Sequence, residues 1–276
     1  MKTMKRKATP LRIAGLVLLG VTGLLADSWK LPQDLPVKDN GPRAYRFTVD
    51  YTTSDTKGQI IHWQRVVGDY TRALPGGDAI WKNVMVAESN GPDEIRGQAQ
   101  KREFMEGFRY HNSPGAGDSM KPDFFKGFPA TAVLERNLVW DAGMIEMFGQ
   151  NYFEHLTLNE PYRAVSSEEM NLPGVGKFQN RNVELTWTGR SQRNGQDCAV
   201  IGYSAYFNPL EIANAGMTLK GRSHYWGEIW VSLTTKQIEY ATLQEDVLGE
   251  LKLAGQDSMQ VISVFRSGVF EPIAKK

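Results

Sequence analysis

The chain has 276 residues, of which 41% are apolar, 11% are aromatic and 23% are charged. These fractions are typical of folded globular proteins and exclude the disordered, collagen-like and disulfide-rich classes. Lysine and arginine together number 32 against 31 acidic residues, and the formal net charge is +1. Beyond the first 12 positions no concentrated run of basic residues occurs, so we expect no nucleic-acid partner.

The first 26 residues have the pattern of an export signal. Basic residues between Lys2 and Arg12 precede an uncharged run from Ile13 to Ala26. This run is shorter than the ~20 residues that a membrane-spanning helix needs, so a retained membrane anchor fits less well than a cleaved signal peptide. We therefore expect cleavage near Ala26 and a periplasmic or secreted mature protein, residues 27–276, that forms a single domain.

Three strands are expected after a proline-containing lead-in that ends at Arg43. They cover residues 44–53, 58–74 and 79–87. In the first of them Tyr45, Phe47 and Val49 alternate with polar residues, which is typical of a sheet with one solvated face. Short turn-forming segments separate the three strands, so they are expected to form an antiparallel meander.

The middle of the chain, residues 122–156, is predicted to be a helical insertion. A loop from Gly115 to Pro129 contains an aromatic patch, and Pro129 suits the first turn of the helix that follows. The helix is predicted from apolar residues spaced three and four apart: Leu134, Leu138, Ile145, Phe148, Tyr152 and Leu156. Gly143 or Gly149 is expected to bend or divide it.

Strands are predicted again from residue 182 onward. They cover residues 182–189, 197–207, 223–233, 237–244, 247–253 and 259–265. The strand 197–207 is apolar on both sides, so we expect a central strand covered on both faces. It contains Cys198, the only cysteine, which is therefore predicted to be a buried structural thiol that forms no disulfide.

Short strands, tight turns and one helical block together predict the α+β class. The expected architecture is a large curved antiparallel sheet, a half-barrel or a part-closed barrel, with residues 122–156 as a cover on its concave side. A closed barrel and a two-sheet sandwich are the alternatives.

No familiar catalytic motif is present. The chain lacks His-Glu-x-x-His, Gly-x-Ser-x-Gly, a phosphate-binding loop and Cys-x-x-Cys. No two of the four histidines, His62, His111, His155 and His224, lie within one helical turn, so no metal site is predicted. The pairs Gly115/Gly117 and Gly174/Gly176 lack the third glycine of a dinucleotide-binding motif, so no cofactor is predicted.

Asp141 is unusual because it lies on the apolar side of the predicted helix, directly after Trp140. A carboxylate there must be paired, cap a helix or face a polar cavity. A helix break at Gly143, which would place Asp141 at an exposed end, is the preferred interpretation. A carbohydrate hydrolase that uses Asp141, Glu146 or Glu154 as acid and base is an alternative function.

Aromatic residues are the other notable group. They are interpreted either as core packing or as the lining of an apolar ligand cavity beneath the helical cover. The candidate ligand-binding residues are Phe124, Phe125, Phe128, Trp140, Phe148, Tyr152, Trp226 and Trp230.

The stretch from Tyr225 to Leu243 resembles the strand-turn-strand of the exported LolA-like half-barrel superfamily, which includes periplasmic lipoprotein and lipid carriers and sigma-factor regulators. The resemblance covers about the last 90 residues. It implies a non-enzymatic envelope protein whose curved sheet and helical lid bind a hydrophobic small molecule, a lipid or a lipoprotein. A protein-protein interaction module with transient envelope contacts is a further alternative.

Overall fold

The computed structural model describes residues 41–90, 98–112, 119, 121, 123–213 and 216–274. The expected signal peptide, residues 1–26, lies outside these residues, as does most of the lead-in. The longer strands are β1 (Arg43–Ser54), β2 (Ile60–Leu74), β3 (Asp78–Ser89), β6 (Pro161–Leu172), β7 (Gly176–Arg193), β8 (Gln196–Ala213), β9 (Met217–Ser232), β10 (Ile238–Leu253) and β11 (Gln260–Pro272). The short strands are β4 (Gln100–Lys101) and β5 (Arg109–His111), and the helical elements are η1 (Glu103–Met105), α1 (Val133–Glu146), η3 (Met147–Asn151) and η4 (Phe153–His155).

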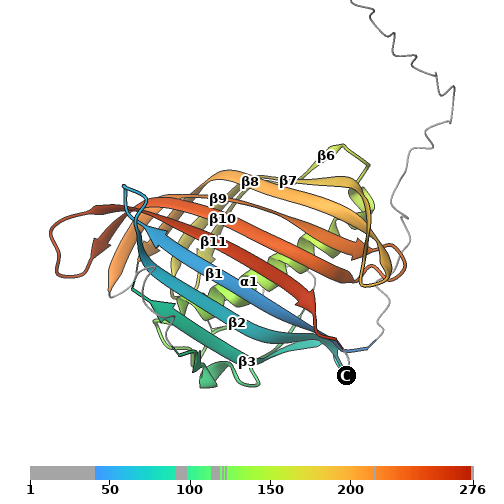
Figure 1. The fold of residues 1–276 in the computed structure, drawn as a ribbon, viewed down its shortest axis with the longest axis horizontal. Helices are drawn as coiled ribbons and strands as arrows, with labels where there is room; N and C mark the ends of the chain where they lie inside the picture. Colours follow the sequence, from blue (N-terminus) through green and yellow to red (C-terminus); the bar gives the residue numbers. More distant parts are fainter. Residues whose placement is uncertain are drawn as a thin grey trace, which may run out of the picture.

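All eleven strands form one antiparallel sheet (Figure 1). The order is β4-β3-β2-β1-β11-β10-β9-β8-β7-β6, with β5 paired to β3 away from this path. The N-terminal β1 and the C-terminal β11 are neighbours, and β4 and β6 are the two edges of the path. Because the sheet is open and single, the closed barrel and the two-sheet sandwich are wrong, whereas the large antiparallel sheet with a mid-chain helix is confirmed.

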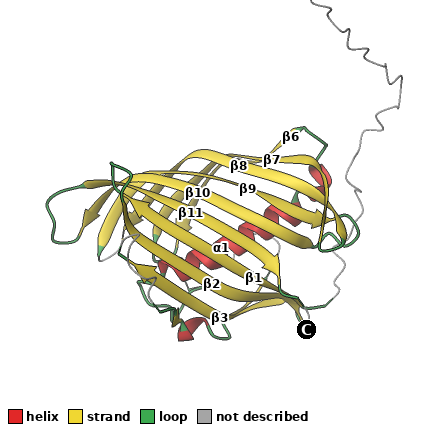
Figure 2. Cartoon of the chain, in the orientation of Figure 1, coloured by secondary structure: helices red, strands yellow, loops and turns green. Residues whose placement is uncertain are grey.

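The two faces of the sheet differ as the alternation in the first strand predicts. Tyr45, Phe47 and Val49 are buried on the face that α1 covers, here called the inner face. Their polar neighbours point to the opposite, outer face, where Arg65 donates two hydrogen bonds of 2.7 Å to Asp50. Figure 2 shows α1 running across the inner face while the outer face carries no helix.

Two glycines mark one place where β9 and β10 approach each other tightly. Gly221 and Gly249 are direct cross-strand partners. A Cβ atom on Gly221 would lie 2.3 Å from the carbonyl oxygen of Leu248, and one on Gly249 would lie 2.8 Å from Leu219 Cδ1. No larger residue fits at this point without moving the backbone, and such sites allow a sheet to bend.

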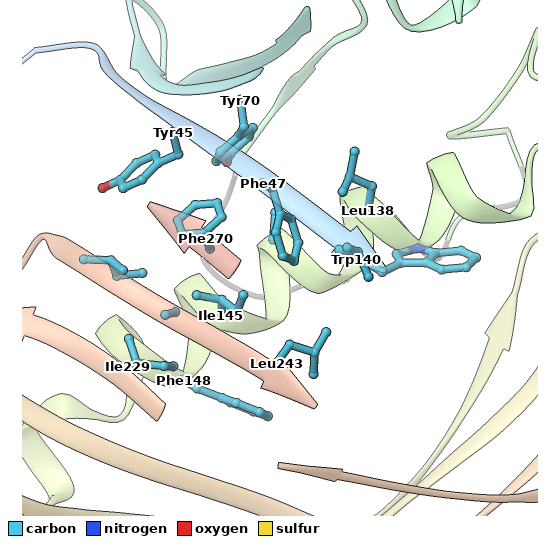
Figure 3. Packing of buried hydrophobic residues seen from close by; sticks show 14 of the residues in the cluster. Tyr45, Phe47, Tyr70, Leu138, Trp140, Ile145, Phe148, Ile229, Leu243 and Phe270 are labelled. Carbon is cyan, nitrogen blue, oxygen red and sulfur yellow. The ribbon is translucent and has the colours of Figure 1, made fainter. Parts of the chain in front are cut away.

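The contact between α1 and the inner face is filled by side chains. Leu138 and Ile145 of α1 point toward Phe47 and Phe270 of the sheet, and all four are fully buried (Figure 3). The Phe270 ring lies 4.4 Å from that of Tyr45 and 5.4 Å from that of Phe47, measured between ring centroids. The expected hollow directly beneath the helical cover is therefore not found along this contact.

The helix differs from its prediction at both ends. It begins at Val133 rather than at Pro129, and it continues through Gly143 without a break. It then widens into the π-helical η3, which contains Gly149. A Cβ atom on Gly149 would lie 3.1 Å from Ile229 Cγ2, so the small residue lets this turn pack closely on the sheet.

Three strand predictions also need correction. β6 was missed because it is an edge strand with mostly polar, exposed residues, which give no apolar alternation. β10 is one continuous strand where two were predicted. The strand 197–207 is not covered on both faces along its whole length, because Tyr206 is 50% exposed and Phe207 is 61% exposed at the bulge between Ala205 and Asn208.

Candidate functional site

A buried group of charged residues lies between α1 and the inner face. Arg266 on β11 forms ion pairs with Asp141 on α1 and with Glu245 on β10. Ser223 on β9 donates a 2.5 Å hydrogen bond to Glu245 Oε1. The guanidinium carbon of Arg266 lies 5.0 Å from the centre of the Tyr51 ring. This arrangement, here called the Arg266 cluster, balances one cation against two carboxylates.

Strand register explains how distant residues reach the Arg266 cluster. Tyr51 pairs with Arg266, Arg266 with Glu245, and Glu245 with Tyr225. These four residues form a row across β1, β11, β10 and β9 on the inner face. Asp141 reaches the same row from α1, which covers the inner face and does not break at Gly143. The carboxylate is thus paired, as its place on the apolar side of the helix requires, and is not at an exposed helix end.

The Arg266 cluster alters the acidity of Asp141. Burial disfavours the charged carboxylate and raises its pKa to about 7, while Arg266 opposes this shift and the negative charge of Glu245 adds to it. At neutral pH Asp141 is therefore close to its midpoint of protonation, whereas in the unfolded chain its pKa would be near 3.8.

This shift predicts how stability depends on pH. Because the folded-state pKa is raised, the contribution of Asp141 is fully present below about pH 4 and is lost as the pH rises to about 7, by at most about 1.4 kcal/mol per pH unit. The Asp141→Asn variant should lack this contribution. We expect the wild type to gain stability relative to Asp141→Asn on acidification from pH 7 to pH 4, measured by urea unfolding at each pH.

Asp78 provides a control of opposite sign. A hydrogen bond from Arg109 lowers its pKa, so its stabilising contribution should be lost as the pH falls through the folded-state pKa. The wild type should therefore lose stability relative to Asp78→Asn only as the pH is lowered below about 4, where the unfolded chain begins to take up the proton. Equal pH profiles for the wild type and Asp141→Asn would contradict the assigned shift of Asp141.

The three carboxylates considered for sugar hydrolysis have separate surroundings. Glu146 is buried beside Arg72, whose Nε lies 3.3 Å from it, and it accepts a 2.8 Å hydrogen bond from Asn112. Glu154 is exposed, with an oxygen 3.7 Å from His155 Nε2. Among the described residues no ion pair or hydrogen bond joins either of them to Asp141.

The predicted aromatic residues fall into separate places. Phe124, Phe125 and Phe128 pack with Phe104, Phe108 and Tyr110 beside the β3 edge. Trp140 joins this group, since its ring lies 5.3 Å from that of Phe125. Phe148 instead packs on Tyr203, and Tyr152 lies 5.9 Å from Tyr162.

Trp226 and Trp230 lie on the outer face. They alternate along β9 with the buried inner-face residues Tyr225, Ile229 and Val231. Trp226 contacts the ring of Phe265 at 6.4 Å and Trp230 contacts that of Tyr240 at 5.2 Å. They therefore cannot line the same space as the other six predicted residues.

A second apolar cluster, here called the far cluster, occupies the inner face beyond the Arg266 cluster. It consists of the buried residues Leu210, Leu219, Val247 and Ile262, with Phe178, Ile212, Leu251 and Val264 partly buried around them. All eight come from β7 to β11, and among the described residues no helical side chain contributes to it.

Sequence reasoning named neither the far cluster nor Arg266 and Glu245. One signal was present, because Glu245 lies between Leu243 and Val247 on the apolar side of β10. A charged residue on the apolar face of a strand predicts a buried partner of opposite charge, in the same way that Asp141 does on the apolar side of its helix.

Cys198 behaves as predicted: it is buried and forms no disulfide, and burial raises the pKa of its thiol to about 11.

No family model matches the chain. No curated protein matches it either. Several solved structures share limited similarity with it, and two of them are described here. One, described as showing lipid-protein interactions in lipovitellin, has a TM-score of 0.35 and 13% identity, over 85% of this chain and 25% of the other. The second, a putative AttH from Nitrosomonas europaea, has a TM-score of 0.25 and 12% identity, over 91% of this chain and 58% of the other.

Similarities at this level assign the chain to no family. The chain also spans only a quarter of the lipovitellin chain and just under three fifths of the AttH chain. The described part of the chain contains no helix long and apolar enough to cross a membrane. Within the same residues, no three His, Cys, Asp or Glu side chains gather in a way that could hold a metal ion.

Proposed function

We propose that the protein is exported and binds a lipid with a long acyl chain on the inner face, at the far cluster. The observation that carries this proposal is the composition of the far cluster: its apolar side chains come from strands alone, and four of them, Phe178, Ile212, Leu251 and Val264, are partly accessible. Apolar surface of this kind is a candidate ligand site because its burial by a hydrocarbon chain is favourable.

The neighbouring polar row supports an amphiphilic ligand. Along β10 the inner-face residues pass from Glu245 to Val247 and Leu251, that is, from the Arg266 cluster into the far cluster. Tyr225, beside Glu245, also donates a 2.8 Å hydrogen bond to Asn180 Oδ1. An acyl chain on the apolar side would thus have hydrogen-bonding groups near its polar end, which is the usual arrangement of an orienting group in an apolar site.

Native mass spectrometry tests this proposal in one measurement. The full-length chain would be produced in a Gram-negative host and purified without detergent. We expect the chain mass to correspond to cleavage near Ala26 and a second species to carry the added mass of a lipid. A protein that is free of lipid, and that also fails to bind a C16 fatty acid added to it, would contradict the proposal.

A matched pair of variants tests the location of the site. Leu251 on the inner face belongs to the far cluster, whereas Leu248, on the same strand, points outward and is 40% exposed. Leu251→Gln removes a side chain whose burial is worth about 1.5–3 kcal/mol, so we expect at least about tenfold weaker binding of a fluorescent C16 fatty acid. Leu248→Gln should bind like the wild type. Equal losses in both variants would place the site elsewhere.

A further inference from the structure

The outer face contains a hollow of about 590 Å³ that spans β7 to β10. This volume lies within the range of about 300–1,000 Å³ that is usual for small-molecule sites. The hollow lies on the face opposite the far cluster, and its walls include Trp226, Tyr206 and two glutamates. It is therefore a second candidate site, with a lining of different chemistry.

The hollow exists because the central strand carries small residues. β8 presents Gly202 and Ser204 to the outer face. Larger side chains flank them in register: Glu184 and Thr186 on β7, and Trp226 and Glu228 on β9. Since neighbouring strands lie about 4.8 Å apart, the two walls stand roughly 9.6 Å apart, with β8 as the floor.

The lining is acidic and aromatic. It contains Glu184 and Glu228 and no lysine, arginine or histidine. Glu184 forms one ion pair, in which its Oε1 lies 3.6 Å from a guanidinium nitrogen of Arg163, and both side chains are exposed. The Glu228 carboxylate makes no ion pair with any described residue. Trp226 is partly buried and Tyr206 is half exposed, so both rings are accessible. Ring faces and carboxylates both attract positive charge.

We infer that this hollow binds an organic ammonium ion. A bare metal cation is disfavoured, because the lining offers only two carboxylates and the described residues contain no group of three His, Cys, Asp or Glu side chains that could hold a metal ion. A neutral sugar could form hydrogen bonds with the threonine and serine hydroxyl groups of the lining. It would gain no ionic attraction from the negative charges of Glu184 and Glu228. A quaternary ammonium group combines a positive charge with apolar methyl groups, which suits the combination of carboxylates and ring faces.

Choline and its uncharged isostere 3,3-dimethylbutan-1-ol test the inference on the full-length protein. The two molecules have nearly the same shape and differ in charge. We expect saturable choline binding in a calorimetric titration and at least tenfold weaker binding of the isostere. Equal binding of the two molecules, or no binding of choline, would overturn the inference. Saturable binding of a neutral disaccharide without choline binding would also overturn it, in favour of a carbohydrate site.

Three variants locate the binding in the hollow. A Cβ atom on Gly202 would have its nearest neighbour, Thr188 Cγ2, at 3.6 Å, so Gly202→Val fits the backbone and fills the floor. We expect Gly202→Val, Glu228→Gln and Trp226→Leu each to weaken choline binding at least tenfold while keeping the circular dichroism spectrum of the wild type. Two control variants should leave choline binding unchanged: Glu250→Gln, which removes a charge at an exposed position of β10 outside the hollow, and Leu251→Gln on the inner face. Unaltered choline binding by folded Gly202→Val would refute the assigned location.

Discussion

Replacement of Arg266 by methionine is expected to lower the free energy of unfolding by about 3–5 kcal/mol, measured by urea unfolding at pH 8. At this pH Asp141 is mostly ionised, and the variant leaves Asp141 and Glu245 buried without their common cation. The cost thus arises mainly from two unpaired buried carboxylates. At pH 5 the loss should be smaller, because Asp141 is then largely protonated in the folded state.

Two further variants separate this effect from lost packing. Arg46 on the outer face pairs with Asp69 at 2.9 Å, and its side chain is 52% exposed. Arg46→Met should therefore cost less than about 1 kcal/mol. Addition of Asp141→Asn and Glu245→Gln to Arg266→Met should recover part of the loss, because the unpaired charges are removed. A cost for Arg266→Met no greater than that of Arg46→Met would contradict this account.

Phe270→Ala is expected to destabilise the protein by about 3–5 kcal/mol, because it removes a fully buried ring and leaves a cavity. Phe270 is fully buried on the inner face, and its ring packs against those of Tyr45 and Phe47 at centroid distances of 4.4 and 5.4 Å. β11 pairs with β1, so this contact also joins the first and the last strand of the described sheet. Thermal and urea unfolding would measure the loss.

The same strand offers the control. Phe265 points to the outer face and is 40% exposed. Phe265→Ala should change the free energy of unfolding by about 0.5 kcal/mol or less, as is usual for surface substitutions. Similar costs for the two phenylalanines would show that the assignment of inner and outer faces is incorrect.

Local patterns in the sequence were sufficient to predict most of the sheet and the presence of the helix. Alternation of apolar and polar residues located β1, β2 and β3, and helical spacing located α1. The same reasoning failed for β8, where apolar residues on both sides suggested double coverage. Tyr206 and Phe207 are exposed although the ring of His224 on the neighbouring β9 lies 6.0 Å and 4.8 Å from theirs, measured between ring centroids. Local sequence does not reveal which face of a strand will be covered.

The candidate sites were harder to predict because they depend on strand register. Arg266, Glu245 and Tyr225 are far apart in the sequence and meet only through the pairing of β11, β10 and β9. The outer hollow likewise depends on Gly202 lying beside Thr186 and Glu228. A single glycine within a strand has many explanations, and only its neighbours across the sheet show that it leaves space.

The polar edge strand β6 has a consequence for the solution behaviour of the molecule. Its outward edge presents backbone N–H and C=O groups that could template another chain. Pro161 opens the strand, and Ser166, Ser167, Glu168 and Glu169 along it are exposed. Carboxylates at such an edge repel the same edge of a second copy and favour hydration over pairing. The polar residues that kept β6 from being predicted as a strand are therefore well suited to oppose fibril-like self-association of this broad, open sheet.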